Sequence, residues 1–289
     1  MMIANDNKIS PQARTKPVEA WSGKDKGDEN FPVASLLIAR ELRPHVHAYY
    51  NYARNADDIS DNTMLSAPEK LARLDAMESS LTGQQTGSSP SAEKLRESLA
   101  QSGVSVTHAR ELLTAFRQDV TKTRYETWEE LMDYCRYSAA PVGRYVLDLH
   151  GESNDTWAAS DALCASLQVL NHMQDCAKDL RELDRCYIPQ DWLRAQGLTT
   201  DDLARSATSP ALRIVFNQML EATEKLNEHA ADLPKRVRSR RLRMECAIIC
   251  HLARRLTVLL KQGDPLATRV KLGKPDMFAA TLHSLRYFA

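Results

Sequence analysis

Two pairs of aspartates with the spacing of one helical face stand out in this chain of 289 residues. Asp57 and Asp61 form the first pair, and Asp175 and Asp179 form the second. Residues four apart on a helix lie about 6 Å from each other, so each pair of like charges destabilises its helix by roughly 0.2–0.5 kcal/mol. A hard divalent cation between the pairs would reverse that effect, and magnesium in such oxygen-lined sites usually also binds a substrate phosphate. The pairs therefore predict an enzyme that acts on a diphosphate.

The residues around each pair favour a binding site over a solvated acidic face, which is the simpler explanation of any single Asp-x-x-x-Asp pair. Arg54 lies three residues before Asp57 and shares its helical face. Gln168 and Asn171 share a face with Asp175 in an otherwise apolar stretch. Buried polar side chains need partners or they destabilise the fold, so two such stripes that both end in carboxylates indicate a shared ligand.

An arginine and a tyrosine follow the second pair closely. Arg185 offers a planar fork of donors that suits a diphosphate, and Tyr187 offers a neutral donor. The alternative is that Arg185 pairs with Asp184 or Glu182 on the surface. The spacing alone does not distinguish these two interpretations.

The composition argues against several other classes of function. Lysine plus arginine (38) equals aspartate plus glutamate (38), so no bulk charge favours binding to nucleic acid. Hydrophobic residues make up 43% of the chain, enough for a core, and ten glycines are few for a turn-rich β fold. The six cysteines form no C-x-x-C pair, which predicts reduced, mostly buried thiols in a cytoplasmic protein.

Two features bear on contact with a membrane. No stretch approaches 18 uninterrupted apolar residues, so we expect no membrane-spanning helix. Residues 235–243 hold six basic residues in nine, and this stretch is either a solvated helix face or a contact with anionic lipid headgroups at the inner membrane surface.

Helical periodicity dominates the chain, and neither strand-like alternation nor an internal repeat interrupts it. We expect helices over residues 32–42, 45–60, 68–81, 91–101, 107–121, 127–149, 160–183, 210–231, 236–262 and 275–287. Residues 1–28 are polar and are predicted to form a mobile tail. Residues 29–289 are predicted to form one all-α domain with functional groups on its inward-facing helix walls.

The segment Tyr134–Gly143 places small residues in the middle of an expected helix. Small residues allow close approach of another helix or of a chain-like ligand, and the periodicity favours helix packing. Pro141 predicts a kink there, because proline removes a backbone hydrogen bond.

Taken together, these motifs resemble the squalene and phytoene synthase family. The two aspartate pairs, the Tyr134–Gly143 segment and Arg185-x-Tyr-x-Pro occur in the family's order, across about residues 29 to 275. The resemblance implies a single all-α bundle with a deep, largely apolar central cavity. It also implies that magnesium and the diphosphate of a prenyl substrate are held at the mouth of that cavity.

Three stretches are most similar to the bacterial hopanoid-pathway branch of the family, which makes hydroxysqualene. They are residues 29–35, 138–143 and 171–179. The chain has Ala-Ala-Pro-Val-Gly where the family commonly has Ala-Gly before x-Val-Gly, and Gln174 where the family commonly has arginine. Both departures point away from ordinary phytoene synthases.

Carried over by position, the resemblance implies four magnesium ligands, Asp57, Asp61, Asp175 and Asp179. It also implies diphosphate or ion-shell contacts at Tyr50, Arg54, Gln168 and Asn171, beside Arg185 and Tyr187.

Further positions match substrate contacts of the family. Asn30 and Phe31 match an N-terminal contact stretch, Tyr134 matches a tyrosine near the reacting carbons, and Arg269 matches a C-terminal basic contact. With Tyr134, Asp57 and Asp175 are the expected catalytic residues.

The implied reaction is the Mg²⁺-dependent conversion of presqualene diphosphate and water to hydroxysqualene and diphosphate. No Gly-rich dinucleotide fingerprint is present, so no nicotinamide is expected. Tyr134, His172 and Glu41 are candidates for placing the attacking water. Two alternatives stay open: condensation of two farnesyl diphosphates to presqualene diphosphate or squalene, and a non-catalytic helical lipid carrier. Transfer of the intermediate between neighbouring pathway enzymes is a further expectation.

Overall fold

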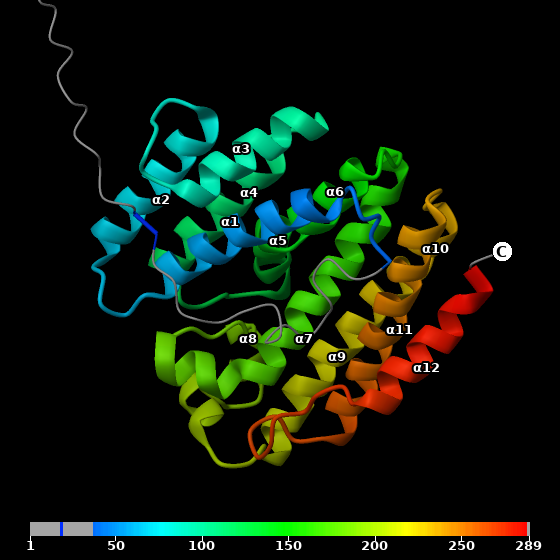
Figure 1. Ribbon diagram of the computed structural model, residues 1–289. Helices are drawn as coiled ribbons and strands as arrows, with labels where there is room; N and C mark the ends of the chain where they lie inside the picture. Colours follow the sequence, from blue (N-terminus) through cyan, green and yellow to red (C-terminus); the bar gives the residue numbers. More distant parts are fainter. Residues whose placement is uncertain (1–17, 20–36, 288–289) are drawn as a thin grey trace, which may run out of the picture.

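The computed structural model describes residues 18–19 and 37–287, and within them the protein is a bundle of helices without a β-strand (Figure 1). The helices are α1 (Arg43–Asp61), α2 (Ala67–Thr82), α3 (Pro90–Ser102), α4 (Thr107–Thr121), α5 (Trp128–Ser138), α6 (Ala140–Leu149), α7 (Trp157–Leu183), α8 (Gln190–Ala195), α9 (Pro210–Ala230), α10 (Leu233–Arg236), α11 (Arg240–Gln262) and α12 (Lys274–Ser284). The predicted all-α class is confirmed. No helix in the described part of the chain is both long and apolar enough to cross a bilayer.

Helix α7 runs through the middle of the bundle and contacts α5, α6, α9 and α11 (Figure 1). Helices α1 to α4 pack together on one side, around buried residues such as Tyr52 and Leu74. Helices α5, α7, α9 and α11 surround a second cluster, around Leu170 and Phe216. Helix α6 contributes buried residues to both clusters, so it joins the two halves of the core.

The predicted helix over residues 32–42 is wrong where the structure describes it. Residues 37–42 form turns, and residues 32–36 lie outside the described ranges. Pro44 opens the first turn of α1, where its missing N–H removes no helical hydrogen bond. Arg43 Nε donates to the carbonyl of Ile38 at 3.0 Å, and this bond closes the turn in place of a helix.

The predicted helix over residues 127–149 is two helices. Ala139 has φ −123° and ψ −49°, which ends α5, and α6 restarts at Ala140 with Pro141 in its first turn. The expected kink is therefore a break, because proline is easily accommodated only at a helix start. A Cβ on Gly143 would lie 2.4 Å from Ser160 Oγ, so this glycine lets α6 pack closely on α7 and confirms the helix-packing interpretation.

The predicted tail overlaps the described residues only at Val18 and Glu19. Val18 donates its N–H to the Ser88 carbonyl at 2.9 Å, and Glu19 Oε1 accepts from Ser89 Oγ at 2.9 Å. These two residues thus contact the start of α3. The boundary at residue 28 stays a prediction.

Candidate active site

The described helices enclose a polar cavity of about 260 Å³ at the junction of α1, α4, α5 and α7. Three of the four predicted metal ligands line it, Asp57, Asp61 and Asp179. The other lining residues are Phe116, Asp119, Tyr134, Ser138, Gln168, His172, Leu183, Arg185 and Tyr187. Helical spacing within α1 and α7 therefore brings both aspartate pairs to one region of the molecule.

The carboxylates of this cavity repel one another. Burial and the nearby Asp61 charge raise the pKa of Asp57 to about 8, although Arg54 opposes the shift. Burial and the charges of Asp175 and Asp61 raise the pKa of Asp179 to about 7. Carboxylates that are held close without enough positive charge resist ionisation, so this cavity favours a bound cation.

Arg54 lies beside the first pair, on the helical face that the sequence predicts. Its guanidinium forms ion pairs with Asp57 at 3.0 Å and with Asp58 at 2.9 Å. These contacts hold Asp57 at the cavity wall from the side of α1.

Arg185 supplies the positive charge on the opposite wall. Its Nη1 lies 2.5 Å from Asp61 Oδ1, and its Nη2 donates to the Ser60 carbonyl at 3.2 Å. The residue is only 6% exposed. A buried guanidinium paired across 124 residues of sequence cannot be a surface ion pair.

The surface alternative for Arg185 is therefore wrong. Asp184 pairs with Arg124 at 2.6 Å, and Glu182 pairs with Arg181 at 3.2 Å. Both neighbouring acids are engaged by other arginines, and Arg185 points inward.

The backbone after α7 explains why Arg185 points inward. Asp184 adopts a left-handed conformation (φ 52°), which ends α7 and turns the chain. Cys186 then donates its N–H to the Thr123 carbonyl at 2.9 Å, in an isolated β-bridge between Arg124 and Cys186. The turn and the bridge hold the segment after α7 against the chain between α4 and α5.

Asp119, on α4, is a cavity residue that sequence reasoning missed. Its carboxylate accepts hydrogen bonds from Tyr134 at 2.9 Å and from Tyr187 at 3.2 Å. Burial raises its pKa to about 7, against the opposing charge of Arg185. One signal was available: with Leu112, Asp119 lies on the apolar stripe of α4, where a carboxylate needs partners.

His172 lies buried between the polar and aromatic parts of this wall. Its ring stacks on Tyr187 with centroids 3.5 Å apart, and Gln168 Nε2 donates to its Nε2 at 3.1 Å. Burial and the charge of Arg185 lower its pKa to about 3. The imidazole is therefore neutral at ordinary pH and offers a ring nitrogen as acceptor.

Asp175 lies outside the lining of the polar cavity, one helical turn from Asp179. Its carboxylate interacts with Arg269, whose Nε is 3.8 Å away. The predicted C-terminal basic residue is thus next to the second aspartate pair.

The carboxylates of the two aspartate pairs are suitable ligands for magnesium. Among residues 18–19 and 37–287, no three His, Cys, Asp or Glu side chains lie close enough together to share one ion. Carboxylate oxygens are nevertheless the ligands that Mg²⁺ prefers, and it usually binds through one or two of them, with waters and substrate phosphates supplying the rest. The donors present therefore fit an ion that binds together with a diphosphate.

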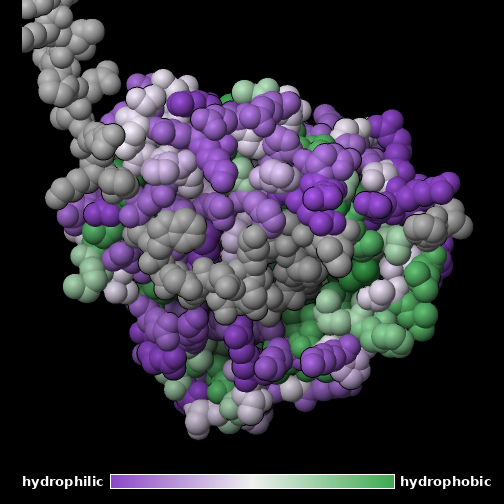
Figure 2. Space-filling view, viewed as in Figure 1, coloured by the Kyte–Doolittle hydropathy of each residue, from purple (hydrophilic) through white to green (hydrophobic). Residues whose placement is uncertain are grey.

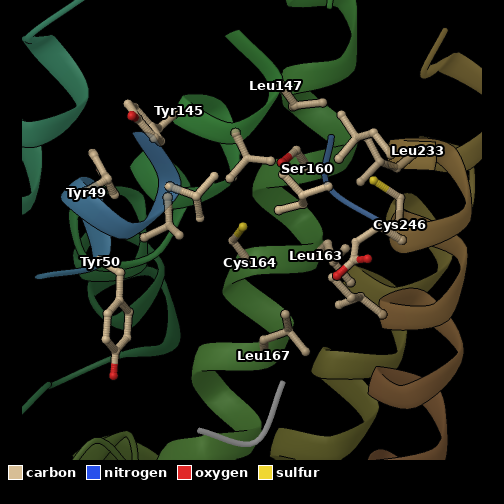
Figure 3. A pocket seen from close by; sticks show the side chains of 18 of the residues that line it. Tyr49, Tyr50, Tyr145, Leu147, Ser160, Leu163, Cys164, Leu167, Leu233 and Cys246 are labelled. Carbon is tan, nitrogen blue, oxygen red and sulfur yellow. The ribbon is translucent and has the colours of Figure 1, made fainter. Parts of the chain in front are cut away.

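A second cavity, of about 340 Å³, adjoins this region and is almost wholly apolar (Figure 3). Leu163, Cys164 and Leu167 face it from α7, and Leu233 and Cys246 face it from the side of α10 and α11. The remaining lining residues are Ile38, Val46, Tyr49, Tyr50, Ala53, Val142, Gly143, Tyr145, Val146, Leu147, Ser160, Asn171, Leu242, Glu245 and Ile249. Tyr50 and Asn171, two predicted diphosphate contacts, thus line the apolar cavity.

The two cavities follow one another along the same helices. On α1, Tyr50 and Ala53 line the apolar cavity and Asp57 lines the polar one. On α7, Leu167 and Gln168 line the two cavities from adjacent positions. A substrate with a charged head and a hydrocarbon chain would lie along this series.

Three further predicted positions have different outcomes. Asn30 and Phe31 lie outside the described residues, and their roles stay predictions. Glu41 is exposed in the turns before α1 and lines neither cavity. The sequence also gave no emphasis to Glu245, a buried carboxylate on α11 that lines the apolar cavity.

The comparisons with known proteins agree with this geometry. The family profile described as squalene/phytoene synthase matches residues 24–276. The chain is 47% identical over 257 residues to a hydroxysqualene synthase of Zymomonas mobilis, which covers 88% of this chain and 86% of that protein. It is also 47% identical over 264 residues to a hydroxysqualene synthase of Rhodopseudomonas palustris, which covers 91% and 90% of the two chains.

Among solved structures, the fold is similar to squalene synthase HpnC from Alicyclobacillus acidocaldarius. The TM-score is 0.70 at 32% sequence identity, over 80% of this chain and 87% of that chain. The family profile covers most of the chain, including all four aspartates of the two pairs. The chain belongs to the squalene/phytoene synthase family.

Proposed function

We propose that this protein converts presqualene diphosphate and water to hydroxysqualene and diphosphate, with Mg²⁺ as its cofactor. The observation that carries the proposal is the series of two cavities, one lined by carboxylates and Arg185 and the next lined by apolar side chains. Identity of 47% to two proteins named hydroxysqualene synthase supports the choice of reaction within the family.

The polar cavity would hold the diphosphate. Asp57, Asp61 and Asp179 line it, with Asp175 one turn away, and these carboxylates would bind the metal. When bound, Mg²⁺ neutralises charge on the leaving diphosphate. The Ser60 carbonyl holds Arg185 in place. Its guanidinium supplies further positive charge where the leaving diphosphate develops negative charge.

The apolar cavity would hold the hydrocarbon chain and the carbocation. Its walls carry few polar groups, so they exclude bulk water from a cation that any stray nucleophile would capture. Glu245 is the single charged side chain among the described residues of this wall.

We therefore propose Glu245 as the residue that orients the attacking water. The water oxygen bonds to the rearranged cation, one O–H bond breaks, and the carboxylate accepts the proton. Tyr134 and His172, which the sequence also suggested for placing this water, line the polar cavity and not the apolar one.

The direct experiment supplies purified protein with presqualene diphosphate and Mg²⁺, without a reductant. Hydroxysqualene and diphosphate are the expected products. Formation of squalene that requires NADPH would overturn the hydration reaction.

A Glu245→Gln variant tests the water-orienting role separately. It should still release diphosphate from presqualene diphosphate but shift product from the alcohol toward hydrocarbons formed by proton loss. Unchanged alcohol yield and rate would remove Glu245 from the mechanism while leaving the overall reaction standing.

Condensation of two farnesyl diphosphates is the alternative within the family. It is distinguished by product analysis with farnesyl diphosphate as the sole substrate. A non-catalytic lipid carrier is the alternative of another class, and it would bind long apolar ligands without Mg²⁺ and release no diphosphate. The clustered carboxylates favour the enzyme, because a carrier has no use for them.

The proposal includes a cytoplasmic location at the inner membrane surface, with substrate passed from neighbouring pathway enzymes. Two features support this location: the basic stretch at residues 235–243 and the water-insoluble hydrocarbon chain of the product.

A further inference from the structure

An apolar strip runs along the outer face of the C-terminal helix. Phe278, Leu282 and Leu285 are 72%, 60% and 54% exposed. Their spacing places them on one face of α12 and the 3₁₀ turn that follows it. Figure 2 shows hydrophobic residues gathered over α12 at the right-hand edge of the molecule.

The opposite face of α12 packs against α11. Ala280 is fully buried against Ile248 and Leu252 of α11, with Met277 beside them. The strip is therefore not needed to hold α12 in place. Three large exposed apolar side chains on one helix face are typical of a contact with another surface.

A basic cluster lies next to the apolar strip. We define it as the exposed residues Lys235, Arg236, Arg238, Arg240 and Arg241, which span α10 and the start of α11. Lys235 lies close enough to Arg286 and Tyr287, at the end of the strip, to interact with both electrostatically. Strip and cluster thus approach each other at the end of the C-terminal 3₁₀ turn, where large apolar groups lie near positive charge.

Much of the charge in this cluster is not neutralised by the protein. Lys235 pairs with Asp232 at 2.9 Å, and Arg238 lies 3.7 Å from Glu152. The ion pairs of the described chain do not include Arg236, Arg240 or Arg241. Guanidinium groups that form no ion pair among the described residues, beside an apolar strip, match anionic headgroups beside acyl chains.

The basic cluster lies over one end of the apolar cavity. Leu233 and Leu242, which flank the basic cluster in sequence, both line that cavity (Figure 3 labels Leu233). Val142, another lining residue, is 41% exposed. A surface in contact with the basic cluster would therefore lie close to the end of the cavity that is remote from the aspartates.

We propose that the apolar strip of α12 and the basic cluster of α10 and α11 together dock this protein on an anionic lipid bilayer. The strip enters the interface between headgroups and acyl chains, and the arginines bind the headgroup phosphates. The docked face brings the far end of the apolar cavity to the bilayer, where an insoluble product can leave. This last step rests on the proposed function, because it needs the proposed reaction, whereas the docking itself does not depend on that reaction.

Vesicle co-sedimentation of the full chain tests the docking without any substrate. The protein should bind phosphatidylglycerol-containing vesicles, and binding to pure phosphatidylcholine vesicles should be much weaker. The triple variant Arg236→Gln, Arg240→Gln, Arg241→Gln should lose about a hundredfold in partition to the anionic vesicles. The triple variant Phe278→Ser, Leu282→Ser, Leu285→Ser should lose at least about tenfold.

Matched controls alter the same residue types elsewhere on the surface. Met64→Ser with Ile214→Ser removes exposed apolar side chains, and Lys94→Gln with Arg205→Gln removes exposed charges. Both controls should bind vesicles as the unaltered protein does. Circular dichroism of every variant should show unchanged helical content, since all the altered side chains are exposed or lie on the surface.

Three results would overturn the proposal: no binding of the unaltered protein to anionic vesicles, equal losses in the controls, or an apolar-strip variant that binds normally. If that variant instead changed the mass in analytical ultracentrifugation, the strip would be a contact between two copies of this chain. Activity in detergent micelles separates the two proposals. Failed docking with retained hydroxysqualene formation overturns the docking and the proposed membrane location but not the reaction, and normal docking without turnover overturns only the proposed reaction.

Discussion

At the scale of single residues, the polar cavity contains more carboxylates than positive charges, so each arginine interacts with several acidic side chains. Arg185 contacts Asp61 directly, and its charge also opposes the burial that raises the pKa of Asp119. Asp119 in turn accepts hydrogen bonds from Tyr134 and Tyr187. A charge-assisted network of this kind orients the aromatic wall of the polar cavity.

Asp119→Asn should therefore reduce turnover and yet stabilise the protein at high pH. Loss of two hydrogen bonds to a charged acceptor should reduce turnover by about tenfold to a hundredfold. Because the pKa of Asp119 is raised from 3.8 to about 7 on folding, its ionisation in the unfolded chain opposes folding, by an amount that grows as pH rises from 3.8 to about 7 and is constant above that. Urea unfolding at pH 8 and pH 5 checks this: the variant should gain more stability at pH 8 than at pH 5. A variant that is less stable at pH 8 would contradict the assignment.

Asp57→Ala and Asp175→Ala should each abolish turnover while helical content stays near that of the unaltered protein. Asp57 already borders the polar cavity and Asp175 is 29% exposed, so truncation of either creates no new enclosed void. Removal of one group that stabilises a leaving diphosphate typically reduces the rate on the order of 10²–10³-fold. Steady-state rates and circular dichroism are the measurements, and Asp155→Ala, on an exposed turn before α7, is the control. Retained activity in either variant would exclude that residue from the proposed metal site.

At the scale of elements, α6 and α7 approach more closely than ordinary side chains allow. The approach is possible because position 143 has no Cβ and because Ala139 ends α5 one residue before α6 begins. Arg144 also joins the two helices, through Asp161 at 2.9 Å and 2.5 Å. Gly143, Ser160 and Cys164, which meet where the two helices approach, all line the apolar cavity, so the packing of α6 on α7 and the shape of the cavity are linked.

Gly143→Ala should destabilise the protein by about 1–3 kcal/mol, the usual range for overpacking. The new Cβ would lie 2.4 Å from Ser160 Oγ and 2.7 Å from Cys164 Sγ. Adding Ser160→Ala and Cys164→Ala removes both atoms and should restore most of the lost stability. Free energies of unfolding for the single, double and triple variants form the test. A triple variant no more stable than Gly143→Ala would show that another contact limits the approach.

Much of the element structure was predictable from periodicity, and the failures have local causes. The predicted range 107–121 agrees with α4, and 210–231 differs from α9 by one residue. The helix prediction failed at residues 37–42 because a short apolar run does not by itself specify a helix. Here a turn is enough to bury Ile38. The helix predicted over residues 236–262 begins only at Arg240, because extended backbone at Val237 and Ser239 separates α11 from the short α10, and no glycine or proline marks that separation.

The site was predictable only where its residues are close in sequence. Both aspartate pairs follow from a spacing of four, and Arg54 from a spacing of three. The partner of Arg185 was not predictable, because Asp61 lies 124 residues away and only the folded chain brings them together. Asp119 was missed because one carboxylate on an amphipathic helix usually faces water.

At the scale of the whole molecule, the polar cavity joins two halves of the core. Asp57 and Asp61 belong to α1, which packs in the cluster of α1 to α4. Asp179 belongs to α7, which packs in the other cluster. A ligand that bridges these carboxylates therefore ties both halves together.

Mg²⁺ with diphosphate should accordingly raise the stability of the whole fold. A ligand at one hundred times its dissociation constant adds about 2.7 kcal/mol to the free energy of unfolding. The pKa values of about 8 for Asp57 and about 7 for Asp179 mean that protons compete increasingly with the metal as pH falls. Thermal unfolding should therefore show a larger shift with ligand at pH 8 than at pH 6. A shift that grows as pH falls, or that persists in Asp179→Asn, would contradict this site.

The left-handed residue at the end of α7 has a consequence for variation in chain length. Asp184 turns the backbone, and the bridge at Cys186 then holds it, so the position of Arg185 depends on the number of residues as much as on their identity. A one-residue insertion or deletion between Asp179 and Cys186 would move the guanidinium away from Asp61 even if every named side chain were kept. Functional relatives should therefore tolerate substitutions in this segment far better than changes in its length.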